Sequence, residues 1–237
     1  MHSGKLFLIP APLGDGPLES VIPQGTLEIL GTLHFFVVEE LRTARRYLKK
    51  ASIKTPIEID KLTLFELNEH TKETEIAPFL QPVLEGNNMG LLSEAGAPAV
   101  ADPGANLIAL AHRRHIEVIP LVGPSSLLLA LMASGLNGQS FAFAGYLPVK
   151  SGERQQRIKQ LEKRSITGQQ TQLFIETPYR NNALLSDILA TCAPHTRLCI
   201  AANITMPDAY IHTLTIAEWK KTAVAIHKKP CIFLMQG

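Results

Sequence analysis

The sequence predicts an α/β protein with two domains, and three observations carry this prediction. Short apolar runs alternate with longer amphipathic segments, which is the pattern of strands separated by helices. The apolar runs hold few polar residues, as is typical of parallel strands buried on both faces. The alternation restarts after residue 122, and 237 residues exceed the roughly 100–150 of a typical domain. We therefore expect one domain over residues 1–119 and a second over residues 120–237.

Four apolar runs predict the strands of the first domain. They are LFLI at 6–9, FFVV at 35–38, MGLL at 89–92 and EVIPLV at 117–122. Amphipathic spacing between them predicts helices near 23–30, 41–51, 71–86 and 104–114. Because helices connect these strands, we expect a parallel sheet with right-handed connections.

The second domain repeats the alternation of helices and strands. The expected helices are 125–134, 151–164, 181–191 and 215–222, and the expected strands are 141–145, 172–176, 198–203, 210–214 and 231–235. This domain is therefore also expected to be α/β.

Composition and charge exclude several classes of protein. Charged residues make up 19% of the chain, below the usual value of about 25%, so a large core is expected and disorder as the main state is excluded. The formal net charge of +2 excludes a chain that coats nucleic acid with its whole surface, so any basic surface has to be local. The uncharged stretch 118–149 is interrupted by Pro and Gly and never offers the roughly 18 apolar residues of a membrane span.

The cysteines and the first residues indicate the compartment. Cys192, Cys199 and Cys231 form no CxxC pair and no zinc-binding spacing with histidine. The N-terminal residues lack the apolar core and cleavage site of a signal peptide. We expect a protein of the reducing cytoplasm, without a bound metal and without a membrane segment.

A loop rich in Gly, Pro and small residues is the strongest candidate for a binding site. It spans Ser93–Gly104, reads SEAGAPAVADPG, follows an expected strand and precedes an expected helix. Ligands of open α/β sheets bind at this carboxyl edge. Strand-to-helix turns usually need about 2–6 residues, so the length of the loop favours a binding site over an ordinary turn.

Two further loops have the same character. They are 10–17, after the first strand, and 122–126, before a helix. In the second of these, Ser125 or Ser126 could contact a ligand or simply cap the helix. The chain carries neither GxGxxG nor GxxxxGK[ST], which disfavours ordinary dinucleotide and P-loop nucleotide binding.

Five segments, in this order along the chain, resemble the tetrapyrrole methylase family. They are the first loop with Pro12 and Gly14, the SEAGAPAVADPG loop, VGPSS at 122–126, FAFAGYLP at 141–148 and FIETPYR at 174–180. GYLPVKSGER at 145–154 and the SEAGAPAVADPG loop are similar, within the family, to the ribosomal small-subunit RNA ribose 2′-O-methyltransferase branch. The resemblance implies a homodimer and S-adenosylmethionine (SAM) as methyl donor, bound in a cleft between the two α/β domains.

The resemblance also implies which residues contact SAM. They lie in the three loops and in the matching segments of the second domain. They are Pro12, Gly14, Ser93, Glu94, Ala95, Gly96, Pro98, Val100, Asp102, Ser125, Ser126, Leu147, Thr177, Tyr179 and Asn203. Tyr179 beside Arg180 suits a nucleotide base or adenine, although the ring could also simply pack.

The chain departs from the branch at several positions. It has Glu94 where the branch has Asp, and Glu40-Leu41 where the branch has Asp-Thr. Residues 202–206 read Ala-Asn-Ile-Thr-Met where the branch has Arg-Glu-Leu-Thr-Lys, and Gly237 follows the last expected strand without the C-terminal extension of the branch.

Methyl transfer to a hydroxyl requires alignment of the reactants and an acceptor for the hydroxyl proton. Glu39 and Glu40 directly follow the FFVV strand and are the carboxylates best placed for catalysis. Each could instead be a solvated acid that caps the helix at 41–51, where the helix dipole favours acids.

A stripe of cations is expected on the helix at 41–51. The spacing of Arg42, Arg45, Arg46, Lys49 and Lys50 places all five on one face. Such a stripe suits a phosphate-bearing partner, or acids from elsewhere in the fold could balance it. A second basic stretch at 150–164 could clamp RNA or face solvent. The predicted RNA-binding residues are Arg42, Arg45, Arg46, Lys49, Arg154 and Arg157.

These features lead to one main hypothesis and two alternatives. The main hypothesis is a SAM-dependent methyltransferase of a ribose 2′-hydroxyl in ribosomal RNA, either naked or within the small ribosomal subunit. One alternative keeps SAM but takes a small tetrapyrrole-like substrate, which the two basic stretches disfavour. The other is a degenerate relative that binds SAM or RNA without transferring methyl groups, motivated by the changes at 202–206.

Overall fold

The computed structural model describes residues 3–237, which form two compact units that divide between Ser125 and Ser126. The sequence-based boundary falls at the end of β5 (Glu117–Pro120), and the loop after β5 belongs to the first unit. Each unit holds one sheet with helices on both faces, which confirms the predicted α/β fold class. No helix within residues 3–237 is long and apolar enough to cross a membrane.

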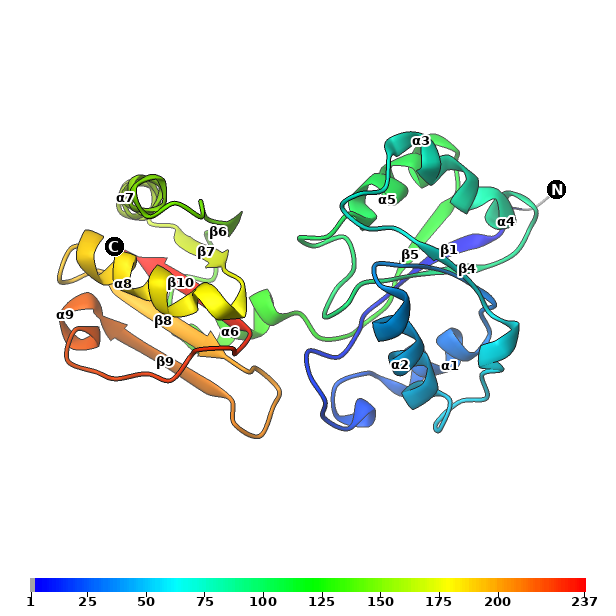
Figure 1. Ribbon diagram of the computed structural model, residues 1–237, viewed down its shortest axis with the longest axis horizontal. Helices are drawn as coiled ribbons and strands as arrows, with labels where there is room; N and C mark the ends of the chain where they lie inside the picture. The colour runs from blue at the N-terminus through cyan, green and yellow to red at the C-terminus, as the bar shows by residue number, and fades with distance from the viewer. Residues whose placement is uncertain (1–2) are drawn as a thin grey trace. The chain divides into compact units, whose positions relative to one another are not determined.

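The sheet of the first unit has five strands in the order β3-β2-β4-β1-β5, all parallel. Figure 1 labels β1, β4 and β5 of this sheet. The strands are β1 (Lys5–Ile9), β2 (Phe35–Val38), β3 (Thr63–Glu66), β4 (Met89–Leu92) and β5. Because all five strands run the same way, their following loops leave from one edge of the sheet. The predictions at 35–38 and 89–92 are confirmed to the residue.

Helices cover both faces of this sheet. On one face, α1 (Gln24–Gly31) and α2 (Leu41–Ala51) pack against the strands and bury Leu27, Leu30, Tyr47 and Leu48. On the other face, α5 (Gly104–Arg113) buries Leu107 and Ala111 beside Leu80 and Val83. Two short 3-10 turns, η1 (Leu18–Ser20) and η2 (Ile59–Lys61), lie in the connections.

Two predictions in this unit were wrong or incomplete. The single helix expected over 71–86 is divided into α3 (Glu73–Ile76), the 3-10 turn η3 (Ala77–Leu80) and α4 (Gln81–Leu84). Pro78 and Pro82 stand at the starts of η3 and α4, and a proline inside a helix removes an N–H donor and clashes with the preceding turn. The edge strand β3 was missed, since its four residues are all at least partly exposed and give no apolar run.

The second unit contains a mixed sheet in the order β6-β7-β10-β8-β9. The strands are β6 (Phe141–Tyr146), β7 (Thr171–Ile175), β8 (Arg197–Ala202), β9 (Tyr210–Thr215) and β10 (Cys231–Gln236). Only β6 and β7 pair in parallel, and the other pairs are antiparallel. The connection from β8 to β9 holds no helix and is too short for a parallel crossover, so these strands form an antiparallel pair.

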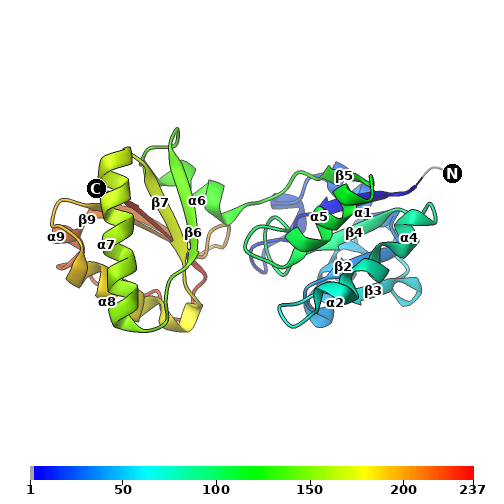
Figure 2. The ribbon, with the colours of Figure 1, turned by 90° about the horizontal axis from the view of Figure 1, so that it is seen from above.

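The helices of this unit lie on opposite faces of the sheet. α6 (Ser126–Ser134) covers one face, while α7 (Ser151–Gly168), α8 (Asn181–Thr191) and the short α9 (Ile216–Trp219) cover the other. α7 packs against α8, and the two helices cross in the view of Figure 2. The 3-10 turn η4 (Pro178–Arg180) directly precedes α8.

The three cysteines belong to the core of the second unit. Cys192, Cys199 and Cys231 are buried and unpaired. Burial raises the pKa of the Cys192 and Cys231 thiols to about 12, so these side chains stay protonated and pack as small apolar groups.

Candidate functional site

The loops after β1 and β4 are joined by a backbone bridge at the carboxyl edge of the first sheet. The Ala11 N–H donates to the Gly96 carbonyl at 2.9 Å, and the Gly96 N–H donates to the Ala11 carbonyl at 3.0 Å. Gly96 has φ +75°, a conformation that favours glycine, and a Cβ added there would lie 3.2 Å from Leu13 Cδ2. The two loops that the sequence selected are therefore tied together, and Gly96 is the residue that permits it.

Asp102 organises the second half of the loop that follows β4. Its carboxylate accepts the Ala99 N–H at 2.8 Å and the Gly104 N–H at 2.7 Å. The loop needs this support because Ala99 and Ala101 both have positive φ, at 65° and 64°. Burial raises the pKa of Asp102, although both N–H groups favour its ionised form. Asp102, predicted to contact SAM, is thus a residue that shapes the loop from within.

Glu39 connects the end of β2 to the same loop. Its carboxylate accepts the Glu94 N–H at 3.3 Å. Burial, together with the neighbouring carboxylates of Asp102 and Glu94, raises the pKa of Glu39 above its ordinary value. Glu39 is thus a half-buried acid at the sheet edge whose ionised form is less favoured than that of an exposed glutamate.

Glu40 is the N-cap of α2. Its carboxylate accepts the Arg42 N–H at 2.8 Å, the Thr43 N–H at 2.6 Å and the Thr43 hydroxyl at 2.7 Å. These hydrogen bonds hold the pKa of Glu40 below its usual range. The capping alternative that the sequence left open is therefore the one that the structure shows for Glu40.

Two side chains of α2 support the loop after β1, and the sequence did not single out either interaction. The Tyr47 hydroxyl donates to the Pro10 carbonyl at 3.1 Å. The Lys50 ammonium donates to the Gly16 carbonyl at 2.5 Å, so it is withdrawn from the predicted stripe. For Tyr47, the signal in the sequence was a polar atom on an otherwise apolar helix face, which needs a partner when it is buried.

The remaining members of the stripe lie on the outer face of α2. Arg42, Arg45, Arg46 and Lys49 are exposed. None of the four belongs to an ion pair within residues 3–237. Glu40, which caps the same helix, is near enough to Arg42 for that charge to lower its pKa, but the two side chains form no ion pair.

Most of the other residues that were predicted to contact SAM lie in the loops of the first unit, which ends at Ser125. Pro12, Gly14 and Ser93 are half-buried, while Glu94, Ala95 and Val100 are exposed. Pro98 is buried, and Ser125 and Ser126 stand where α6 begins. Their contact with SAM stays a prediction.

The second unit begins at Ser126 and holds four further residues that were predicted to contact SAM. Leu147 is buried in the core, Thr177 is half-buried beside η4, and Tyr179 is 70% exposed. Asn203, with φ +48°, directs its amide to Asp208 at 2.8 Å. Their contact with SAM also stays a prediction.

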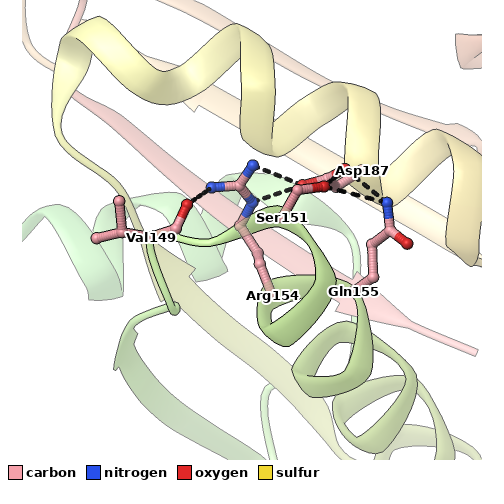
Figure 3. A network of polar contacts seen from close by, with 5 residues as sticks. All are labelled: Val149, Ser151, Arg154, Gln155 and Asp187. Carbon is pink, nitrogen blue, oxygen red and sulfur yellow. Dashed lines mark hydrogen bonds and ion pairs between the residues drawn. The ribbon is translucent and has the colours of Figure 1, made fainter.

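Arg154 was predicted to bind RNA, but its side chain is buried in the second unit. Its guanidinium is buried and bonds Asp187 of α8 through Nε at 2.7 Å and Nη2 at 2.5 Å (Figure 3). Nη1 donates to the Val149 carbonyl at 2.9 Å, and the Ser151 hydroxyl and the Gln155 amide also donate to Asp187. The sequence-based assignment of Arg154 to RNA is thus wrong, because its charge is satisfied inside the second unit. Arg157 is half-buried on the same helix, and its role stays a prediction.

Metal ligation finds no support in the part of the chain that the structure describes. Within residues 3–237, no group of three or more His, Cys, Asp or Glu side chains is placed to hold a metal ion. Glu39, Glu94 and Asp102 gather at one edge but act on backbone N–H groups and on Thr43.

Comparison with known families identifies the chain. A family model of tetrapyrrole (corrin/porphyrin) methylases matches residues 5–220, which include parts of both units. The chain belongs to this methylase family. The predicted membership is therefore confirmed, and the protein is a methyltransferase.

Curated relatives of this methylase are similar over most of its length. The ribosomal RNA small subunit methyltransferase I of Vibrio cholerae is 30% identical over 213 residues, which cover 90% of this chain and 69% of the relative. Its counterpart in Escherichia coli O157:H7 is 29% identical over 237 residues, covering 99% and 78%. That of Synechocystis sp. is 32% identical over 202 residues, covering 85% and 67%.

Two solved structures share the fold of this methylase. The crystal structure of the methyltransferase CobJ has a TM-score of 0.66 and 19% identity, covering 99% of this chain and 95% of that chain. The crystal structure of uroporphyrin-III-C-methyltransferase from Thermus thermophilus has a TM-score of 0.56 and 18% identity, covering 98% and 92%. At such identities the likeness shows the fold alone.

Proposed function

We propose that this methylase transfers a methyl group from SAM to a ribose 2′-hydroxyl of small-subunit ribosomal RNA. The observation that carries the proposal is the similarity, along 85–99% of the chain, to relatives named ribosomal RNA small subunit methyltransferase I. The cations on α2 support it, since this helix starts beside the loop after β4 and its exposed charges suit phosphates.

We infer that the carboxyl edge of the first sheet contributes to the SAM site. Its loops fit a ligand that needs close backbone approach, because Ala95 and Ala101 are small and exposed. The Ala11–Gly96 bridge and the Asp102 hydrogen bonds fix the main chain before a ligand arrives. Preorganisation of this kind lowers the cost of binding.

Methyl transfer from SAM to a hydroxyl requires the protein mainly to align the two reactants. Bound SAM supplies a methyl group on a sulfonium, and transfer removes the positive charge of the donor. Holding the acceptor hydroxyl in line contributes several kcal/mol, on the order of 7–11 at best. We propose Glu39 as the acceptor of the hydroxyl proton, since Glu40 is already engaged by three donors of the α2 N-terminus. The raised pKa of Glu39 makes it the stronger base when ionised.

Methyl transfer itself tests the function. Purified protein with tritiated SAM should label the RNA of small ribosomal subunits, and mass spectrometry of the digested RNA should find a 2′-O-methylated nucleoside. Glu39→Gln should lose transfer and keep its SAM affinity. RNA binding without label, on particles and on naked RNA, would favour the degenerate alternative. Label only on a tetrapyrrole would favour the small-substrate alternative.

The stripe on α2 can be tested separately from catalysis. Replacing Arg45 and Arg46 with Gln should weaken RNA binding and lower the slope of log affinity against log salt by up to about two units, because two phosphate contacts are lost. Arg113 and Arg114 are a matched control, since they are adjacent, exposed and at the far end of α5. Replacing both with Gln should leave the slope unchanged, and equal effects of the two double variants would contradict the role of the stripe.

We also propose a homodimer in the cytoplasm, as the resemblance and the composition imply. Light scattering at micromolar concentration should give about twice the chain mass of 25.9 kDa. A single 25.9 kDa species would contradict the dimer.

A further inference from the structure

An exposed aromatic ring with cations around it lies on the second unit where η4 follows β7. We call it the Tyr179 platform and define it by Tyr179, Arg180, His227 and Lys228. The Tyr179 side chain is 70% exposed. The Lys228 ammonium lies over its ring, 5.8 Å from the centroid, and the His227 ring meets it edge-on at 6.2 Å. A large exposed ring beside a cation is a surface that invites a partner.

The platform is held by hydrogen bonds between two distant segments of the chain. The Lys228 N–H donates to the Pro178 carbonyl at 3.0 Å. The buried Asn181 amide donates to the carbonyls of Ile226 at 3.0 Å and Lys229 at 2.7 Å. Lys228 also has φ +61°, an uncommon conformation for a non-glycine residue, which these bonds maintain. The ring and its cation therefore stay together before any ligand binds.

Arg180 is fixed at the side of the platform by a buried acid. The Glu176 side chain is fully buried and accepts Arg180 Nη2 at 2.6 Å and the Thr177 N–H at 2.7 Å. The hydrogen bond that Arg180 donates to Glu176 raises the pKa of Arg180, so the guanidinium is always charged. It keeps 38% of its side-chain surface exposed. A planar, partly exposed cation is thus held in a fixed orientation at the residue that follows Tyr179.

We propose that the Tyr179 platform binds an unpaired base of the RNA substrate, with Lys228 on the adjoining phosphate. This inference rests on the proposed function and names the feature of the RNA that the second unit binds. Proteins bind single-stranded RNA by stacking its bases on aromatic rings beside cations that contact the backbone. This inference replaces the earlier assignment of Tyr179 to SAM. The adenine of SAM fits less well, because small-ligand sites bury most of the ligand, whereas this ring faces solvent. SAM carries no phosphate, and its sulfonium and ammonium cations outweigh its single carboxylate, so Lys228 and Arg180 suit the phosphates of RNA better than SAM.

Binding of a short RNA isolates the stacking contribution. The probe is a labelled single-stranded oligoribonucleotide of about twelve nucleotides, within the length that such surfaces cover. Tyr179→Ala should weaken its binding about tenfold, as expected for the loss of one stacked base, while Tyr179→Phe should stay within about twofold. Lys228→Gln should lower the salt slope by about 0.7, the value for one phosphate of a single strand. SAM affinity, measured by calorimetry, should not change in any of these variants.

Two controls separate stacking from a general loss of structure. Phe141→Ala removes another exposed aromatic ring of the same unit, for which no neighbouring cation is found within residues 3–237, and should leave RNA affinity unchanged. An oligoribonucleotide with abasic riboses keeps the phosphates but has no bases. On it, the wild type and Tyr179→Ala should bind equally.

The outcomes distinguish this inference from the proposed function. If Tyr179→Ala methylates ribosomal RNA and binds the oligoribonucleotide like the wild type, the platform assignment is wrong and the function stands. If Tyr179→Ala loses SAM affinity and keeps RNA affinity, the ring belongs to the adenine and the inference is overturned. If the wild type neither binds RNA nor labels small ribosomal subunits, the proposed function fails and the inference fails with it.

Discussion

The buried Arg154–Asp187 pair should be a main source of stability in the second unit. The two side chains are only 5% and 10% exposed, and Asp187 also accepts hydrogen bonds from Ser151 and Gln155. Although burial on its own would raise the pKa of Asp187, the hydrogen bonds lower it below its ordinary value, so the carboxylate is ionised at neutral pH. Asp187→Ala therefore leaves a guanidinium buried with the Val149 carbonyl as its remaining acceptor among the described residues.

The expected loss is about 3–5 kcal/mol in the free energy of unfolding, the usual cost of removing one partner from a buried ion pair. Replacing both residues, as in Arg154→Met with Asp187→Leu, removes the orphaned charge and should recover most of that loss. The size of the effect follows from burial, because an exposed pair of the same chemistry contributes only about 0–1 kcal/mol.

Urea unfolding followed by the fluorescence of Trp219 measures this loss. Trp219 is the single tryptophan, it is buried in the second unit, and its indole donates to the Leu198 carbonyl at 2.8 Å. With a slope of about 1–3 kcal/mol per molar urea, the midpoint should fall by more than about 1 M in Asp187→Ala. A shift worth less than about 1 kcal/mol would refute the reasoning, as would a double variant no more stable than the single one.

Two further predictions concern the edge of the first sheet. Glu39→Gln should raise the thermal midpoint at pH 7, because the pKa of Glu39 is raised in the folded state and its ionisation therefore destabilises the fold. The gain should vanish as the pH falls below 4.5, the ordinary pKa of the group. An equal gain in thermal midpoint at all pH values would contradict this reasoning. Gly96→Ala should lower the free energy of unfolding by about 1–2 kcal/mol, because Ala disfavours φ +75°, and should weaken SAM binding. The control Gly25→Ala, in helix α1 with open space around it, should instead stabilise by up to about 1 kcal/mol, and calorimetry should find its SAM affinity unchanged.

The sequence predicted the elements whose signal is local. α2 has the predicted bounds because its apolar and charged residues follow a helical period, and β2 and β4 are continuous apolar runs. β3 gave no such signal because it lies at the edge of the sheet and is partly exposed. The interrupted segment at 71–86 kept a helical period, and only the prolines at 78 and 82 carried the information that the helix is divided.

The site was harder to predict, because roles depend on partners that are distant in sequence. Arg154 and Arg157 lie one helical turn apart on α7, yet only Arg154 meets Asp187, which belongs to another helix. Glu39 and Glu40 are adjacent acids after one strand, but Glu40 caps α2 whereas Glu39 accepts a hydrogen bond from the loop after β4. Neither distinction follows from the spacing of residues in the sequence. The first depends on the position of α8, and the second depends on the position of the loop after β4.

Helix α2 shows how one short segment can serve the fold and the site together. Its inner face buries Leu48 in the core, and Tyr47 and Lys50 hold the loop after β1 through two backbone carbonyls. At its N-terminus, Thr43 donates to Glu40 and, at 3.4 Å, to Glu94 in the loop after β4. The outer arginines are thus mounted on the same rigid element that supports both loops. A substitution on the outer face should therefore alter RNA binding without moving the loops. A substitution at Tyr47 or Thr43 should alter both RNA binding and the positions of the loops.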